Sequence, residues 1–474
     1  MECSGRLLTV IFDGTTHVGE VFANIFRWVD ENINIIERLV ELGKYQHSFD
    51  HEELVDAVSQ VLARFNIDKG LKENRRIVRI GNVIAFQRDR CSVNTAAINI
   101  LCRNYIGAKD MECLSHTLCH PGDHLHIPVL LKMKQDLCAL IKDSYGAEVH
   151  WSYIFGVAFR HPGKTRWWAS FELYEFMNKN FDLYLEWLQT VVDEGGVGEN
   201  GARIQRLKAT VRDGNENAAW LRLELSVVAL TMEPLVTACY KLEGKGPCAI
   251  IAFDIVKRVE SFFEVHHPTL SYPGVRAAMV TCVNALTIIP AINALQFAEP
   301  GHIDNLVNAR VRSLLNPAIA YFRSRIFDKL AEDIAIYKTM RYANPLAMKR
   351  NRQTFTVAEF RANVEALQHF SIAEVEEMVA EIPLYVACFD DIPEHLWEAD
   401  DMTFSQQFWK LRKHEFPALT KFVIYAFTMI SSSAAAERVF SILKRCFLNG
   451  QRLALEDYQM LSCMLQINRR NNQA

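Results

Sequence analysis

Short apolar runs alternate with polar turn residues along the first 150 positions of the chain. The first run, residues 7–12, is continuous and ends at Asp13 and Gly14, as expected of a central buried strand. Two further strand-like runs, residues 18–28 and 32–42, follow with only a short polar connection between them. This spacing predicts an antiparallel meander.

A helix is predicted directly after the meander. Asp50 is its expected N-cap, and Glu53, three residues later, completes a capping box. Apolar residues then recur at helical spacing up to Phe65, so that one face of the helix packs on the sheet. A strand at residues 83–86 and a helix at 96–105 complete an α/β sheet with the meander at one side.

Long helix-like stretches dominate from about residue 165 to 416, which predicts a large helical domain. Within it, residues 277–298 carry no charge; we expect a buried helix pair broken at Pro290, with a membrane span as the weaker alternative. Three more helix-like pieces follow Phe416. The last, residues 455–468, is apolar on nearly every face and must be buried, against its own domain or a partner.

Charge and composition narrow the possible partners and compartment. The formal net charge is −4, so no global basic field indicates a nucleic-acid partner, and any such binding must use local patches. The 12 cysteines are dispersed, and the N-terminus lacks the basic region and cleavage site of a signal peptide. These features predict a reduced, intracellular protein.

Two carboxylates occupy positions suited to metal chemistry. Asp13 and Asp89 each follow the end of a short apolar strand, at the rim of the sheet where active sites of α/β proteins lie. Carboxylates from neighbouring strands can hold two hard divalent cations, which clamp the attacking and leaving oxygens of a phosphodiester. Turn or cap residues are the simpler interpretation of both.

Three other segments have a functional and a structural interpretation. Residues 113–126 hold zinc-type ligands, but they are crowded and have no distant second pair, so a strand with a histidine loop is favoured and no structural zinc is expected. Arg166 and Trp167 could contact phosphates and stack on bases, or belong to a core helix. Glu437 and Arg438 enter an apolar, alanine-rich helix; a carboxylate there must be paired or metal-bound, unless the pair forms an exposed face.

Taken together, these segments resemble the hAT superfamily of DNA transposases. The C-terminal match begins near Phe408-Trp409-Lys410 and includes the serine/alanine run that ends in Glu437-Arg-Val-Phe-Ser441. The family's acidic motifs resemble the segments at Asp13 and Asp89, its Cys-x-x-His motif fits residues 113–116, and its Arg-Trp pair fits residues 166–167. All five occur in the family's order over almost the whole chain.

The resemblance implies a fold and a mechanism. The fold is an RNase H-like mixed sheet interrupted by a large all-α insertion: residues 1–165 form the first part of the catalytic domain, 166–415 the insertion, and 416–474 the end of the domain with the dimerisation region. Asp13, Asp89 and Glu437 would bind two Mg²⁺ or Mn²⁺ ions for DNA cleavage and strand transfer.

The resemblance also implies partners and a location. DNA would be contacted by His116, Arg166 and Trp167, in the nucleus. Self-association would use the last helix, with contacts from Leu461, Met464 and Leu465.

One departure from the family leaves two classes of function open. Family members usually carry an N-terminal BED-type zinc finger, and no Cys/His finger fits before Asp13. We therefore expect a truncated or domesticated copy. The chain is then either a metal-dependent DNA nuclease and strand transferase or a non-catalytic, dimerising binding factor.

Overall fold

The computed structural model describes most of the chain. The residues described are 3, 5–15, 20–45, 47–65, 79–80, 82–163, 167–194, 198–211, 216–299, 301–396, 399–447 and 464–469.

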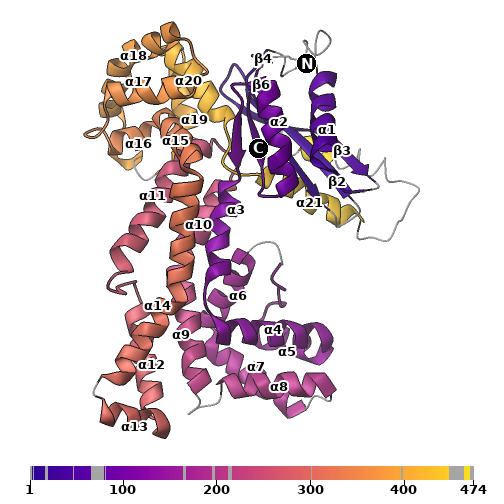
Figure 1. Cartoon of the computed structure of the whole chain (residues 1–474), viewed down its shortest axis with the longest axis vertical. Helices are drawn as coiled ribbons and strands as arrows, with labels where there is room; N and C mark the ends of the chain where they lie inside the picture. Colours follow the sequence, from indigo (N-terminus) through magenta and orange to yellow (C-terminus); the bar gives the residue numbers. More distant parts are fainter. Residues whose placement is uncertain are drawn as a thin grey trace. The chain divides into compact units, whose positions relative to one another are not determined.

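A five-stranded mixed sheet forms the first part of the fold, with the strand order β3-β2-β1-β5-β7 (Figure 1). Strands β1 (Leu8–Thr15), β2 (Glu20–Val29) and β3 (Ile35–Tyr45) are antiparallel, which confirms the predicted meander. Strands β5 (Val83–Arg88) and β7 (Lys109–Glu112) continue the sheet parallel to β1. Two short strands, β4 (Arg79–Ile80) and β6 (Tyr105–Ile106), pair separately.

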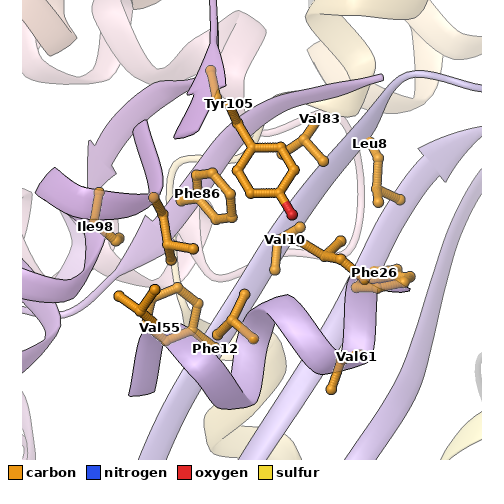
Figure 2. Close-up of a cluster of buried hydrophobic side chains, with 14 of the residues drawn as sticks. Leu8, Val10, Phe12, Phe26, Val55, Val61, Val83, Phe86, Ile98 and Tyr105 are labelled. Carbon is orange, nitrogen blue, oxygen red and sulfur yellow. The ribbon is translucent and has the colours of Figure 1, made fainter. Parts of the chain in front are cut away.

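One face of the sheet is covered by helices α1 (His51–Arg64) and α2 (Ser92–Asn104). Helix α1 begins at the predicted capping box, in which Asp50 and Glu53 bond reciprocally. Alternate residues of the first strand point to this face, and Figure 2 shows Leu8, Val10 and Phe12 among the buried side chains of this core.

The other face is covered by helix α21 (Ala434–Phe447) and by the helical turn at residues 464–469. Here Ile11 of β1 packs with Ala436 and Val439 of α21 and with Ile467. Small alanines let the helix approach the strands closely, and the segment furthest along the chain thereby covers its first strand.

Every described element between Trp167 and Phe416 is helical. The helices run from α6 to α19: Trp167–Lys179, Phe181–Glu194, Gly198–Val211, Glu216–Thr231, Glu233–Leu242, Ala249–His266, Val275–Thr287, Pro290–Ala298, His302–Arg323, Ala331–Met340, Pro345–Arg350, Val357–Ala366, Ile372–Ala387 and Asp401–Arg412. Helices α3 (Leu114–Cys119), α4 (Pro128–Asp143), α5 (Tyr145–Phe155) and α20 (Pro417–Thr428) flank this region.

The chain forms two compact units that each combine separate stretches of sequence. The first unit holds the sheet and comprises Met1–Thr117, Cys239–Lys257 and Ile326–Ala474. The second unit comprises Leu118–Ala238 and Arg258–Arg325 and is helical in its described residues.

The uncharged segment at residues 277–298 forms a helix pair, α12 and α13, with the break at Pro290 as predicted. The expectation that the pair is buried was wrong. Only Val275, Cys282 and Leu286 of α12 are buried, because one face of the helix packs inside the unit while the opposite face meets solvent. In the described part of the chain no single helix is long and apolar enough to cross a bilayer; the bent pair α9–α10 passes by length and composition only.

Candidate functional site

Three parallel strands end at the same edge of the sheet and bring separate motifs into one row. Ile11 of β1 lies opposite Gln87 of β5, so Asp13 and Asp89 each lie two residues beyond a paired position. Arg88 of β5 lies opposite Glu112 of β7, so Cys113 directly follows that pair. Asp89 directly follows β5 as predicted, whereas Asp13 lies within β1, which stays paired with β2 as far as Thr15. Strand β7 was not anticipated, because its four residues are mostly polar.

Asp13 is a buried carboxylate with an unusual protonation equilibrium. The residue is only 8% exposed, and its Oδ1 accepts a hydrogen bond from the Gly14 N–H at 2.9 Å. Burial, followed by the negative charge of Asp89, raises the pKa of Asp13 to about 7, although nearby His116 acts in the opposite direction. Two carboxylates so close together form a local excess of negative charge that a cation would relieve.

Asp89 is held in place by the start of the following helix. Its Oδ1 accepts hydrogen bonds from the Cys91 N–H at 2.9 Å and from the Asn94 Nδ2 at 2.7 Å. Asn94 lies in the first turn of α2 and is buried. The sequence analysis did not assign this role to Asn94. Its position, five residues after Asp89 and in the first turn of a helix, could have indicated that it orients the carboxylate.

Cys113, directly after β7, forms hydrogen bonds with the segment that leads into α21. Its buried sulfur accepts the N–H of Ser433 at 3.3 Å and the N–H of His116 at 3.5 Å. The N–H of Leu114 donates to the carbonyl oxygen of Ser431 at 2.9 Å. The predicted strand at this point was wrong: residues 114–119 form helix α3, whose first turn carries His116.

Glu437 and Arg438 are adjacent in sequence but have different partners. Glu437 Oε1, in the first turn of α21, lies 3.8 Å from His116 Nε2. The Arg438 guanidinium donates to the carbonyl oxygen of Glu243 at 3.0 Å and lies 3.4 Å from the Glu37 carboxylate. Because Arg438 anchors α21 in this way, the interpretation of the pair as a simple exposed face was wrong.

The side chains at this edge of the sheet include oxygen ligands suited to a hard divalent cation, but a complete set of metal ligands is not preformed. Asp13 and Asp89 provide the oxygen ligands that Mg²⁺ and Mn²⁺ prefer, and the negative charge of Asp89 adds to burial in raising the pKa of Asp13. Across the described ranges, however, no group of three or more His, Cys, Asp or Glu side chains is close enough to hold a metal ion. The structure therefore brings Asp13 and Asp89 together and places Glu437 Oε1 3.8 Å from His116 Nε2.

The other two predicted DNA contacts are Trp167, which belongs to the second unit, and Arg166. Trp167 begins α6 in the second unit and packs directly on Gly122, where an added Cβ would lie 1.8 Å from the indole ring. The backbone N–H of Trp167 donates to the Cys119 sulfur at 3.1 Å. Arg166 lies outside the described residues.

Two of the three predicted dimerisation residues, Met464 and Leu465, lie in the last described helical turn. Leu465 is 52% exposed, whereas Met464 packs partly against the core beneath α21 and Ile467 is buried in it. Leu461 lies outside the described residues.

Comparison with known proteins assigns the C-terminal part of the chain. Residues 393–466 match the family model of the hAT family C-terminal dimerisation region. No curated protein matches the chain. The matched range contains the serine/alanine run, Glu437 and Leu465, and it gives the chain an element for self-association. The chain thus carries the C-terminal dimerisation region of the hAT family and resembles hAT transposases in this part.

Proposed function

We propose that the chain is a metal-dependent DNA-cleaving and strand-transfer enzyme with an RNase H-like catalytic domain, acting on DNA in the nucleus. The observation that carries this proposal is the proximity of Asp13 and Asp89 on adjacent parallel strands, where burial, followed by the negative charge of Asp89, raises the pKa of Asp13 to about 7. A buried carboxylate beside a second negative charge is costly, and carboxylates with a pKa raised in this way are concentrated at functional sites.

Each acidic residue has a distinct part in this proposal. Asp13 and Asp89 would hold Mg²⁺ or Mn²⁺, with Glu437 as the third carboxylate. When bound, a metal pair stabilises the attacking and leaving oxygens of a phosphodiester. Asn94 fixes one oxygen of Asp89 through a 2.7 Å hydrogen bond. His116, between Asp13 and Glu437, offers a hydrogen-bond donor to the acids or to a DNA phosphate.

The test is a cleavage assay on a labelled DNA duplex with increasing Mg²⁺ or Mn²⁺. The variants Asp13→Asn, Asp89→Asn and Glu437→Gln remove a charge with little change in shape. We expect each to reduce cleavage at least roughly 100-fold, since each would remove a metal ligand. Glu52→Gln, an exposed change at the start of α1, is the matched control and should cleave like the unaltered chain. Equal cleavage by all four variants would refute the proposed triad.

The alternative function is a non-catalytic dimerising factor that binds DNA or protein. One observation favours it: the described residues hold no group of three side chains placed for a metal ion. This alternative predicts DNA binding without cleavage at any Mg²⁺ or Mn²⁺ concentration. It also predicts no change in melting temperature when either metal is added, whereas the enzyme should be stabilised by ligand binding.

A further inference from the structure

Two long stretches of the second unit, apart from the residues at their ends, contain no acidic side chains. No Asp or Glu occurs from residue 265 to 298 or from residue 305 to 327. The same two stretches hold five arginines: Arg276, Arg310, Arg312, Arg323 and Arg325. This part of the chain is therefore locally positive, although the formal net charge of the whole chain is −4.

Two of the arginines lie on the same side of the long helix α14. Arg312 and Arg323 are eleven residues apart in this helix, and both are exposed. Because an α-helix turns by about 100° and rises by about 1.5 Å per residue, the two positions differ by about 20° around the axis and about 16 Å along it. Asn316 lies between them on this side and is also exposed.

The segment that follows α11 packs against this side of α14. His267 Nε2 lies 2.8 Å from Asn316 Oδ1, and the Arg312 guanidinium donates to the carbonyl oxygen of Pro268 at 2.8 Å. Burial, and after it the positive charges of Arg312 and Arg323, lowers the pKa of His267, although its hydrogen bond to Asn316 acts in the opposite direction. Both guanidinium groups therefore lie near the imidazole. We call His267, Arg312, Asn316 and Arg323 the arginine patch.

The two arginines of the patch keep their charge for an outside partner. Arg310, on the same helix, forms an ion pair with Glu224, which is buried. Within the described ranges, by contrast, neither Arg312 nor Arg323 forms an ion pair with a carboxylate. Two exposed guanidinium groups without an acidic partner attract an anion from solution.

The acids at the ends of the two stretches do not neutralise the patch. Glu264 lies three residues before His267, yet no carboxylate of the described chain shifts the pKa of that histidine. Glu299 lies 3.1 Å from His302. Asp304, in the first turn of α14, is about 12 Å along the axis from Arg312, which exceeds the Debye length of about 8 Å at physiological salt.

The chemistry and spacing of the patch favour a partner with regularly repeated phosphates. A guanidinium presents planar, paired donors that match a phosphate, and the Asn316 amide adds a neutral donor of the kind that contacts DNA backbones. Phosphates follow one another at about 3.4 Å of rise along each strand of a duplex, so a duplex offers anions over the whole distance from Arg312 to Arg323. An acidic peptide would need carboxylates at one matching spacing.

We propose that the arginine patch binds the phosphate backbone of duplex DNA without regard to base sequence. The choice of DNA as the polyanion rests on the proposed function, but binding at the patch requires neither a metal ion nor cleavage. The patch is the kind of local basic surface that a chain of net negative charge needs for nucleic-acid binding.

Fluorescence anisotropy with the full chain and a labelled duplex, in EDTA and at several salt concentrations, is the first test. We expect Arg312→Gln combined with Arg323→Gln to weaken binding at least roughly 10-fold at about 0.15 M salt. The slope of log affinity against log salt should fall by about 2, equally for two duplexes of unrelated sequence.

The matched control removes two exposed arginines that already face a carboxylate. Arg222 pairs with Asp182 and Arg361 pairs with Glu376, so Arg222→Gln combined with Arg361→Gln removes the same charge and should leave affinity and slope unchanged. Asp13→Asn should bind DNA like the unaltered chain. A loss of cleavage with intact binding therefore concerns the proposed catalytic site, and a loss of binding concerns the patch.

Two further variants separate charge from folding. Arg323→Gln alone breaks no hydrogen bond within the described part of the chain, and it should lower the slope by about 1 with an unchanged circular dichroism spectrum. Arg312→Lys combined with Arg323→Lys keeps both charges and should retain most of the affinity.

Three results would overturn the proposal. The first is equal affinity and slope for the double glutamine variant and the unaltered chain. The second is no binding of duplex DNA by the unaltered chain. The third is binding of polyglutamate, but not of duplex DNA, with the same dependence on Arg312 and Arg323, which would assign the patch to an acidic protein partner.

Discussion

The side-chain amide of Asn468 pairs with both backbone polar groups of Leu39, although 429 residues separate them. The Leu39 N–H donates to Asn468 Oδ1 at 3.0 Å, and Asn468 Nδ2 donates to the Leu39 carbonyl oxygen at 3.2 Å. Leu39 lies on β3, which is an edge strand of the sheet. The amide thus satisfies edge groups that a neighbouring chain could otherwise pair with.

We expect Asn468→Leu to lower the free energy of unfolding by about 1–3 kcal/mol, because it leaves two backbone groups of Leu39 without this partner. Hydrogen exchange should show faster exchange of the Leu39 amide. Gln466→Leu, an exposed change two residues earlier, is the control and should leave both quantities unchanged. Unchanged exchange at Leu39 in the Asn468 variant would contradict the edge-capping role.

A buried ion pair supports the second prediction. Arg27 is fully buried; its Nη1 lies 2.7 Å from Glu37 Oε1, and it also donates to the carbonyl oxygens of Phe427 and Gly246. We expect Glu37→Ala to cost about 3–5 kcal/mol in chemical denaturation, because the guanidinium keeps its charge without a carboxylate. Arg27→Met combined with Glu37→Leu should recover most of that loss. If Glu37→Ala lowers the free energy of unfolding by less than about 1 kcal/mol, the carbonyl oxygens of Phe427 and Gly246, together with water, are enough to stabilise the Arg27 charge.

The third prediction follows from the pKa of Asp13, which rises from 3.8 to about 7 in the folded chain. The folded state then binds this proton more tightly than the unfolded state, so stability from this group is lost as pH rises from about 4 to about 7. Asp13→Asn should therefore be more stable than the unaltered chain at pH 8, by about 1–3 kcal/mol, and should lose this advantage at pH 4.

Melting temperatures at the two pH values measure this difference. Asp333, whose pKa burial also raises to about 7, is present in both proteins, so the comparison isolates Asp13. If Mg²⁺ binds at this edge, adding it at pH 8 should raise the melting temperature of the unaltered chain and not that of the variant. A variant that is less stable at pH 8 would contradict the burial cost.

The fourth prediction concerns the C-terminal turn. Leu465 is exposed, whereas Ile467 is buried in the core beneath α21. We expect Leu465→Asp to reduce self-association with little loss of stability, and Ile467→Asp to lower stability by several kcal/mol. Light scattering and thermal denaturation separate the two effects. Equal mass for Leu465→Asp and the unaltered chain would remove Leu465 from the dimer interface.

The sequence alone determined the features that depend on neighbouring residues. The capping box of Asp50 and Glu53, the antiparallel meander and the helix break at Pro290 follow from local hydrogen bonding, backbone geometry and side-chain alternation. The carboxylate that follows β5, Asp89, was also predicted, whereas the predicted end of the first strand at Asp13 was wrong, because pairing with β2 continues β1 to Thr15.

Only the tertiary structure decided which distant groups meet. Strand β7 has too few apolar residues to be recognised, yet it places Cys113 where its sulfur accepts an N–H from Ser433. Composition indicated a buried α12, whereas packing buried one side and left the other in solvent. The partners of Arg438 and Asn468 lie roughly 200–430 residues away in the chain. Such contacts form only when separate segments pack, so no local pattern in the sequence encodes them.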